Sequence, residues 1–303
     1  MKNQLETKIH IKKLNSDTFF YIFNNIFLLF ALLVVAIPLL HVISASFSDA
    51  RAVSAGNVFL LPVDFSLKGY TEVFKQSKVL VGYGNTIFYT VLGTCINLVF
   101  TVMAAYPLSR KNLPFRKIFI MLFTFTMIFS GGMIPTYMLM NNLGLLNSRL
   151  VMMLPNAINI FNLTIAKNFF ENNVPEELFE AAQIDGCNYF KFIKNIVLPL
   201  SKPILAVLAL YYAVVHWNAY FDAFLYITDP DKLPLSMALR DILIMNTVTA
   251  ESMMDAKEML AKQGMADLLK YSLIVVSSVP LVAAYPFISK HFAKGTLTGA
   301  VKG

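Results

Sequence analysis

Apolar residues come in runs long enough to cross a lipid bilayer, and this feature limits the folds open to the chain. A membrane-spanning helix needs about 20 apolar residues, and within lipid only helices and closed barrels satisfy all backbone N–H and C=O groups. Hydrophobic residues make up 57% of the 303 residues and charged residues only 14%, whereas soluble domains carry about 25% charged residues. The sequence therefore predicts an all-α polytopic membrane protein.

Six of these runs predict six transmembrane helices, at residues 19–47, 83–108, 118–139, 151–170, 204–227 and 268–288. The first run is longer than the apolar part of a cleavable signal peptide, so we expect it to stay in the protein. The six spans together form one predicted transmembrane domain at residues 19–288. It lies between an N-terminal segment at 1–18 and a C-terminal tail at 289–303.

The positions of lysine and arginine predict which side of the membrane each segment faces. The short connection after the second predicted span is the most strongly basic, with Arg110, Lys111, Arg116 and Lys117. Positive charge collects on the cytoplasmic side of membrane proteins. We therefore expect a multi-pass protein of the plasma or inner membrane, with both termini, this connection and the polar segment 172–199 in the cytoplasm. The net charge of +7 then reflects topology and not a nucleic-acid surface.

The opposite connections are predicted to lie outside the cell, at residues 48–82, 141–150 and 228–267. The last of these is partly acidic, and its acidic residues alternate with Met and Leu. This pattern predicts one or two short amphipathic helices on the outer surface. The segment is either a docking surface for an extracytoplasmic partner or a folded lid, and its spacing favours neither.

The polar segment between the fourth and fifth predicted spans contains the sequence EAAQIDGCNYFKFIKNIVLP at residues 180–199. Glu176 and Glu177 place negative charge at a helix N-terminus, where it is stabilising. Gly186 falls where a left-handed residue ends a helix. We expect two short helices joined by a turn at Gly186, the second closed by Pro199. An ordinary solvated loop is the alternative for these features taken alone.

The fifth predicted span concentrates polar and aromatic side chains, namely His216, Trp217, Asn218, Tyr220 and Asp222. Polar residues inside a membrane span are costly and therefore candidates for function. Aromatic faces combined with amide and carboxylate groups suit sugars, whose ring faces are apolar and whose hydroxyls need donors and acceptors. These five residues are our candidates for a substrate pathway. An outer aromatic belt is the competing interpretation of the ring side chains.

Other polar residues within the spans favour structural roles. Asn156, Asn159 and Asn162 recur every three residues and are expected on one helical face, where we favour helix–helix contacts over a binding site. His41 is expected to be a packed histidine and not a ligand.

Several kinds of chemistry have no sequence support. The chain has no phosphate-binding glycine loop and no HExxH motif. Its two cysteines, Cys95 and Cys187, lack metal-ligand spacing. We expect a non-enzymatic protein with no catalytic residue, no metal site and no cofactor of its own.

A longer pattern points to a family. Glu-Ala-Ala at 180–182 is followed by Gly186 and, after nine intervening residues, by Ile-Val-Leu-Pro at 196–199. With it come AAYPLSR at 104–110, FSGGMIPT at 129–136, HWN at 216–218 and a glycine-rich stretch at 295–303. Nearly the whole chain resembles the permease subunits of carbohydrate ABC importers, in the MalG-like and LplC-like branch.

The resemblance implies a type I ABC-importer permease fold with a cytoplasmic coupling helix in the loop 172–199. It assigns ATPase contact and turn roles to Glu180, Ala181, Ala182, Asp185, Gly186 and Pro199. The implied partners are a second homologous permease, two ATPase subunits that bind ATP and Mg²⁺, and an extracytoplasmic solute-binding lipoprotein. The C-terminal tail would reach toward the ATPase interface and the 228–267 loop toward the binding protein.

The implied function is ATP-driven uptake of oligosaccharides. An ABC permease for a non-sugar solute is the nearest alternative. A channel or ion-coupled carrier, with His216 and Asp222 as a proton relay, is a more distant one.

Overall fold

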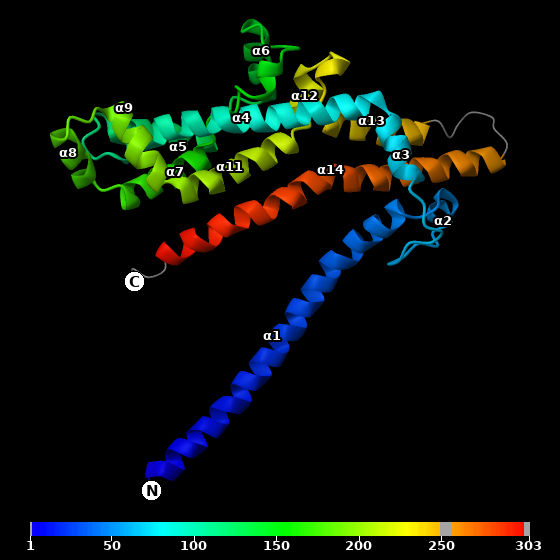
Figure 1. The fold of residues 1–303 in the computed structure, drawn as a ribbon, viewed down its shortest axis with the longest axis horizontal. Helices are drawn as coiled ribbons and strands as arrows, with labels where there is room; N and C mark the ends of the chain where they lie inside the picture. Colours follow the sequence, from blue (N-terminus) through cyan, green and yellow to red (C-terminus); the bar gives the residue numbers. More distant parts are fainter. Residues whose placement is uncertain (1, 249–255, 300–303) are drawn as a thin grey trace. The chain divides into compact units, whose positions relative to one another are not determined.

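The longest uninterrupted apolar runs form the longest helices in the computed structural model of the chain (Figure 1). These helices are α1 (Lys2–Ser46), α4 (Ser77–Ser109) and α14 (Ala256–Gly299). The main chain is described at residues 2–248 and 256–299, and side chains at 18–242, 263–284 and 286. Within the three helices, Thr18–Ser46, Ser77–Ser109 and Gln263–Ala284 are long and apolar enough to cross a membrane. The first, second and sixth predicted spans therefore each lie in one continuous helix.

Two further apolar stretches are bent. Helix α5 (Arg116–Ile128) meets α6 (Met133–Asn142) at 114°, and between them Gly132 has a positive φ of 88°. The helical stretch Tyr189–Leu200 meets α11 (Lys202–Trp217) at 82°. The described residues thus contain three candidate spans, or five if each bent pair is counted as one. This result agrees with a helical membrane protein, whereas the number of six spans stays a prediction.

The fourth predicted span, at residues 151–170, is not one helix. A 3₁₀ helix, η1 (Arg149–Met152), is followed by irregular backbone at residues 153–159 and then by α7 (Ile160–Asn173). We call residues 153–159 the break. Because Asn156 and Asn159 lie in the break, the prediction that the three asparagines share a helical face is wrong. Asn159 instead caps α7, since its Oδ1 accepts a hydrogen bond from the Asn162 N–H at 3.1 Å.

Residues 1–73 and 245–276 form the first of two compact units. After α1 come α2 (Ala50–Ser54) and an irregular loop that leads to α3 (Lys68–Lys75). The loop returns along the end of α1, where the Ser44 hydroxyl donates to the Leu60 carbonyl at 2.7 Å. His41 Nδ1 lies 3.1 Å from the Phe59 carbonyl, and its ring packs edge-on against Tyr271. The prediction of a packed histidine at this position is confirmed.

Residues 74–244 and 277–303 form the second unit, which is built around α4. Helices α7 and α11 both pack along α4 (Figure 1). Their shared core is apolar and extends to the segment that follows α7. Its buried members include Val102, Tyr106, Leu163, Phe170, Phe192 and Leu208.

Short helices make up most of the remaining chain. They are α8 (Glu176–Ile184), α9 (Tyr189–Phe192), a π-helical turn η2 (Ile193–Val197), α10 (Leu198–Leu200), α12 (Phe221–Tyr226), η3 (Pro230–Lys232) and α13 (Leu235–Val248). Helix α13 lies in the predicted outer connection and confirms a short helix there. Residues 249–255 of that connection and 300–303 of the C-terminal tail lie outside the described residues, as do the side chains of residues 287–299.

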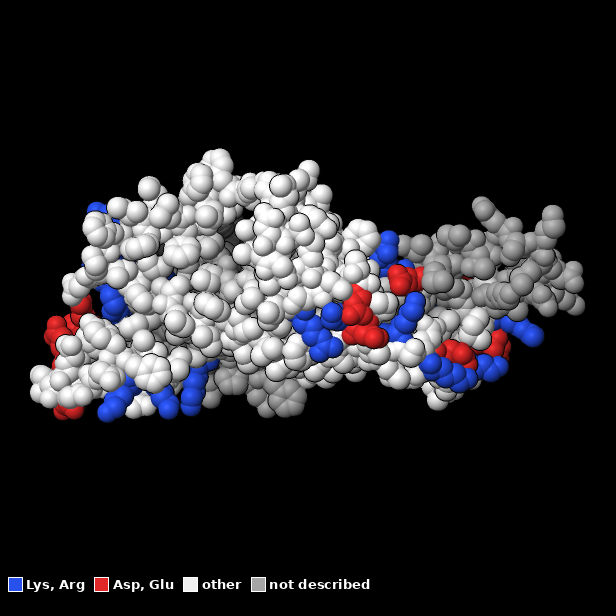
Figure 2. Space-filling model, turned by 90° about the horizontal axis from the view of Figure 1, so that it is seen from above, with Lys and Arg blue, Asp and Glu red and all other residues white. Residues whose placement is uncertain are grey.

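Charged residues are absent from the middle of the long helices of the second unit. No Asp, Glu, Lys or Arg occurs in α4 after Lys78, and none occurs in α11 after Lys202. Figure 2 shows the charged side chains of one face in separate groups, with wide uncharged areas between them. The uncharged stretches of α4 and α11 are what helices within lipid require.

Candidate functional site: the coupling turn and the membrane break

Gly186 forms the turn between α8 and α9. Its φ of +74° lies in the left-handed region, which only glycine enters without a steric cost. The Cys187 N–H donates to the Ala182 carbonyl at 2.9 Å, and the Gly186 N–H donates to the Gln183 carbonyl at 3.0 Å. This pair of bonds is the Schellman end of a helix. The predicted conformation of Gly186 is therefore confirmed.

One side of α8 is buried and the other is open. Ala182 is 6% exposed and belongs to the core of the second unit, whereas Glu180, Ala181 and Asp185 are exposed. Ile184 is 87% exposed and Phe190, in α9, is 75% exposed. The sequence analysis did not identify these two residues. Each is a large apolar side chain within a polar segment, and this feature could have indicated an exposed contact surface.

Aromatic packing fixes the buried side of this turn. The ring of Phe179 in α8 stacks on Tyr189 at 4.4 Å between centroids and meets Phe192 edge-on at 5.1 Å. Phe192 is fully buried and lies beside Tyr106 near the end of α4. Pro199 is exposed within α10, and that helix ends one residue later. We call residues 176–192 the coupling turn.

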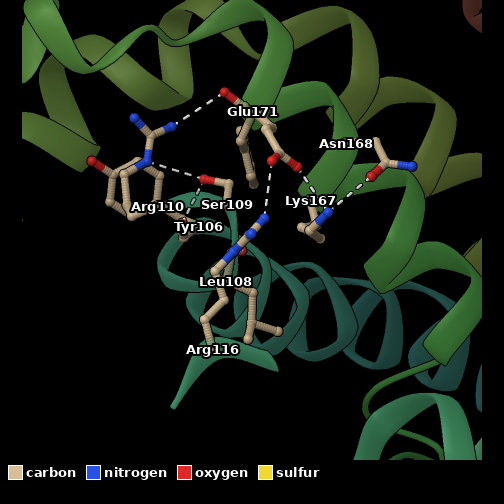
Figure 3. A network of polar contacts seen from close by, with 9 residues as sticks. Tyr106, Leu108, Ser109, Arg110, Arg116, Lys167, Asn168 and Glu171 are labelled. Atoms are coloured by element: carbon tan, nitrogen blue, oxygen red, sulfur yellow. Dashed lines mark hydrogen bonds and ion pairs between the residues drawn. The ribbon is translucent and has the colours of Figure 1, made fainter. Parts of the chain in front are cut away.

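A network of charged groups ties the end of α7 to its neighbours (Figure 3). The Arg110 guanidinium donates to the Phe170 carbonyl at 3.2 Å. Glu171 pairs with Arg116 at 2.9 Å and with Lys167 at 2.8 Å. The hydrogen bond from Lys167 is the main cause of a pKa for the Glu171 carboxyl below its ordinary value. The basic cluster that predicted topology therefore also holds the helix that leads into α8.

The loop between α4 and α5 also reaches the coupling turn directly. Asn112 in that loop donates a hydrogen bond to the Glu176 carboxylate at the start of α8. The coupling turn is thus bound to the rest of the second unit by both apolar packing and polar contacts.

Asn97 of α4 holds the backbone of the break. Its side-chain Nδ2 donates to the carbonyls of Asn156 and Ala157, at 2.8 Å and 3.0 Å. Its Oδ1 lies 2.6 Å from His216 Nε2. Because the amide nitrogen faces two carbonyls, the amide oxygen must face the ring, and His216 Nε2 is the donor of the third bond.

A second polar pair lies one helical turn away. Thr101 Oγ1 of α4 is 2.6 Å from the Tyr212 hydroxyl of α11, and that hydroxyl accepts a hydrogen bond from the Asn159 N–H at 3.3 Å. The two helices approach closely at Gly93, where an added Cβ would lie 2.5 Å from His216 Nε2.

Three of the five candidate substrate residues make contacts within the second unit. His216 is 6% exposed and bonded to Asn97. Trp217 Nε1 donates to the Ser277 carbonyl at 3.0 Å. Asn218 Nδ2 donates to the Val214 carbonyl at 2.8 Å, at the end of its own helix. These contacts give each of the three a structural role that spacing alone could not reveal.

The other two candidates have free polar groups or accessible rings. Tyr220 is 38% exposed and stacks on Phe224 at 6.1 Å. In the part of the chain that the structure describes, no group donates a hydrogen bond to the Asp222 carboxylate and no cation lies within ion-pair distance. Asp222 is half-buried in α12, so its carboxylate is available to an outside partner.

A cavity of about 380 Å³ lies between α5 and the break. The break and the start of α7 supply Leu154, Pro155, Ala157, Ile158 and Ile160, and α5 supplies Phe119, Leu122, Phe123 and Thr126. Its walls are mostly apolar, so it suits a ring face or an acyl chain better than a charged group. No cluster of three or more potential metal ligands occurs among the described residues.

Comparisons with known proteins agree on one kind of relative. The chain is 44% identical to Protein LplC of Bacillus subtilis (strain 168) over 270 residues, which cover 88% of this chain and 89% of that protein. It is 43% identical to the polygalacturonan/rhamnogalacturonan transport system permease protein YtcP of the same organism over 278 residues, which cover 91% and 96%. No protein-family model matches the chain.

A solved structure has the same fold. It is the crystal structure of a bacterial ABC transporter involved in the import of the acidic polysaccharide alginate. One chain of that structure superposes on this chain with a TM-score of 0.83 and 34% sequence identity. The match covers 91% of this chain and 98% of that one.

Proposed function

The chain belongs to the permease subunits of carbohydrate ABC importers, and from this premise we propose how its residues take part in import. Six spans form the wall of an oligosaccharide pathway, with both termini in the cytoplasm. The coupling turn docks into an ATPase subunit, which binds the ATP and Mg²⁺. A second homologous permease, a second ATPase subunit and an extracytoplasmic solute-binding lipoprotein complete the importer.

The observation that carries this proposal is that one side of α8 is buried while its other side is exposed. Ala182 is packed against the core, while Ile184 beside it is 87% exposed together with the carboxylates of Glu180 and Asp185. Ile184 of α8 is followed by two exposed rings of α9, Tyr189 at 61% and Phe190 at 75%, and several exposed apolar side chains among polar ones are typical of a protein–protein contact. The positive-inside pattern favours a cytoplasmic position for this helix, where lipid does not cover it.

The proposed mechanism is mechanical. When the ATPase subunits close on ATP, they move α8. The ring of Phe179 packs on Phe192, which packs on Tyr106 near the end of α4. Asn112 of the loop after α4 bonds Glu176, so the movement reaches the spans. The spans then alternate between inward-facing and outward-facing states. No chemical step is assigned to this chain, whose relatives are transporter subunits and not enzymes.

The names of the relatives support a saccharide as the substrate, since YtcP is named for a polysaccharide transport system and the solved structure for polysaccharide import. We propose that Tyr220, which precedes α12, and Asp222 within α12 contact it. The variant Asp222→Ala should change uptake without changing assembly. Unchanged uptake would assign Asp222 a structural role. Competition by unlabelled sugars, amino acids and osmolytes would separate a sugar permease from one for another solute.

Purification from native membranes tests the assembly. The tagged chain is extracted in mild detergent, and mass spectrometry identifies the proteins that accompany it. We expect a second permease, an ATPase with phosphate-binding loops and a solute-binding lipoprotein. Recovery of the chain with only copies of itself would contradict the proposal and favour an ion-coupled carrier, in which His216 and Asp222 act on protons.

Two substitutions test the coupling turn. Gly186→Pro fixes φ near −65° and removes the N–H that bonds Gln183, and Glu180→Arg reverses an exposed charge. We expect at least a tenfold loss of sugar transported per ATP hydrolysed, with normal amounts of protein in the membrane. Gly186→Asn is the matched control, because asparagine tolerates the left-handed conformation. Normal transport by either Gly186→Pro or Glu180→Arg, with a normal amount of protein in the membrane, would contradict the proposed role.

A further inference from the structure

We propose that Asn97 is a positioning residue of the transport cycle, which holds the break against α4 so that the break moves together with the coupling turn. This inference rests on the proposed docking of α8 to an ATPase subunit. It adds a second site to that mechanism, namely the contacts of Asn97. On the predicted topology this site lies inside the membrane, and Asn97 is far along the chain from the coupling turn.

On the predicted topology the break lies at membrane depth, and it therefore needs such a residue. Asn97 lies about 20 Å along the α4 axis from Arg110, at 1.5 Å per residue, which is well inside a hydrocarbon layer of about 30 Å. Carbonyl groups outside a helix need polar partners at this depth. Asn97 is 1% exposed, and its amide supplies partners to two such carbonyls, those of Asn156 and Ala157.

The contacts form two rungs between α4 and α11. Asn97 pairs with His216 in one rung, and Thr101 pairs with Tyr212 in the other. The members of each helix are four residues apart and therefore share one face. Asn97 reaches the middle of the break, and Tyr212 reaches its last residue, Asn159. We call these four side chains the ladder.

The opposite end of α7 is also fixed to α4. The Arg110 guanidinium bonds the Phe170 carbonyl at the end of α7, and the next residues of the chain lead into α8. Helix α7 is therefore held at the break by the ladder and near its C-terminal end, which leads into the coupling turn, by the Arg110 contact. With both ends fixed, α4, α7 and α11 move as one lever, and a displacement of α8 reaches the break.

The break also shapes the cavity beside α5. Leu154, Pro155 and Ala157 form part of its wall, and Ala157 is one of the two residues whose carbonyl Asn97 holds. A displaced break changes this wall. Without the ladder, α7 would follow α8 while the break stayed behind, so that ATP would be hydrolysed without transport.

The test is the ratio of sugar transported to ATP hydrolysed, measured with the complete importer in proteoliposomes. Asn97→Leu keeps the approximate shape and removes all three hydrogen bonds. We expect its ratio to fall at least tenfold, with assembly intact. Thr94→Val is the matched control on the same helix, since the Thr94 hydroxyl is buried without a hydrogen-bond partner among the described residues. It should keep the wild-type ratio.

The ratio of sugar transported to ATP hydrolysed distinguishes a loss of mechanical coupling from a loss of protein stability. A variant that only weakens folding lowers the amount of importer, and it therefore lowers transport and hydrolysis together. A wild-type ratio for Asn97→Leu overturns the inference. If Asn97→Leu does not assemble, Tyr212→Phe decides, because it removes a single oxygen of the second rung. We expect a several-fold lower ratio for Tyr212→Phe, and a wild-type ratio there also overturns the inference.

Gly186→Pro in the same assay separates the two proposals. If its ratio falls and that of Asn97→Leu does not, the ladder has no role in coupling while the docking of α8 stands. If Gly186→Pro has the wild-type ratio, the docking of α8 fails, and the inference fails with it.

Discussion

At the scale of single residues, Gly93 shows how closely α4 and α11 approach. A methyl group there would lie 2.5 Å from His216 Nε2, inside any normal contact distance. We predict that Gly93→Ala lowers the free energy of unfolding by about 1–3 kcal/mol, the usual cost of overpacking. The measurement is thermal unfolding of the purified chain in detergent.

Gly84 offers a matched control on the same helix. An added Cβ there meets no atom within 4 Å, so Gly84→Ala should stabilise the helix by up to about 1 kcal/mol through backbone entropy. Equal melting temperatures for the two variants would contradict the close approach at Gly93.

The contacts of the fifth predicted span were beyond sequence reasoning. Its composition singled out His216, Trp217 and Asn218 as candidates for a substrate pathway. It could not show the contacts of His216 and Trp217, because Asn97 is 119 positions from His216 and Ser277 lies in another helix. The turn at Gly186 was predictable because its signal is local, as a left-handed glycine follows the last turn of a helix.

At the scale of helices, uninterrupted apolar runs were predictable and breaks were not. Residues 151–170 are apolar enough to predict a span, yet residues 153–159 leave the helix. Pro155 disfavours helix at the residue before it, and Asn97 and Tyr212 supply bonds that replace those of a helix. The bend between α5 and α6 had a local signal in Gly131 and Gly132, of which Gly132 has a positive φ.

The end of α7 carries a pH-dependent contribution to stability. The Glu171 pKa is lowered from 4.5, chiefly by the hydrogen bond from Lys167. A carboxyl with a lowered pKa in the folded state stabilises the protein fully at neutral pH. This stabilisation decreases as the pH falls below the pKa of the unfolded state, and it is lost as the pH falls through the lowered pKa of the folded state. We predict that Glu171→Gln costs about 1 kcal/mol at pH 7, as expected for partly exposed ion pairs.

The pH dependence of this difference is the test. Thermal unfolding of the wild type and of Glu171→Gln is compared from pH 7 down to pH values below 4.5. The difference in melting temperature should be largest at pH 7 and should shrink as the pH falls. Glu177→Gln, an exposed carboxylate of α8, is the control. A difference for Glu171→Gln that is unchanged in acid would exclude the paired carboxylate as its cause.

At the scale of the whole molecule, the apolar surface is too large for a protein in water. None of the apolar window of α1 is buried, and α5 contributes no buried residue. Within lipid this surface costs nothing, because hydrocarbon is as apolar as leucine. The exposed faces of α1 and α5 are therefore available to lipid or to the proposed second permease. In the proposed cytoplasmic position, the exposed apolar residues of the coupling turn would instead face water and need a protein partner.

The orientation of the whole chain is the remaining prediction, and it follows from the lysine and arginine distribution. Cys187, next to Gly186, should face the cytoplasm, and Leu61, which is 76% exposed, should face outward. We would label intact cells with a membrane-impermeant maleimide. One variant is Cys95→Ser, which leaves Cys187 alone, and the other is Leu61→Cys in a chain with both native cysteines replaced by serine.

We expect Leu61→Cys to react in intact cells and Cys187 to react only after permeabilisation. The reverse pattern would invert the topology and contradict the positive-inside assignment. Reaction of both in intact cells would place an even number of crossings between residues 61 and 187, against the three that six spans require there. Either result would also remove the coupling turn from the cytoplasm, where ATP is hydrolysed, so the orientation of Cys187 decides whether α8 is able to meet an ATPase subunit at all.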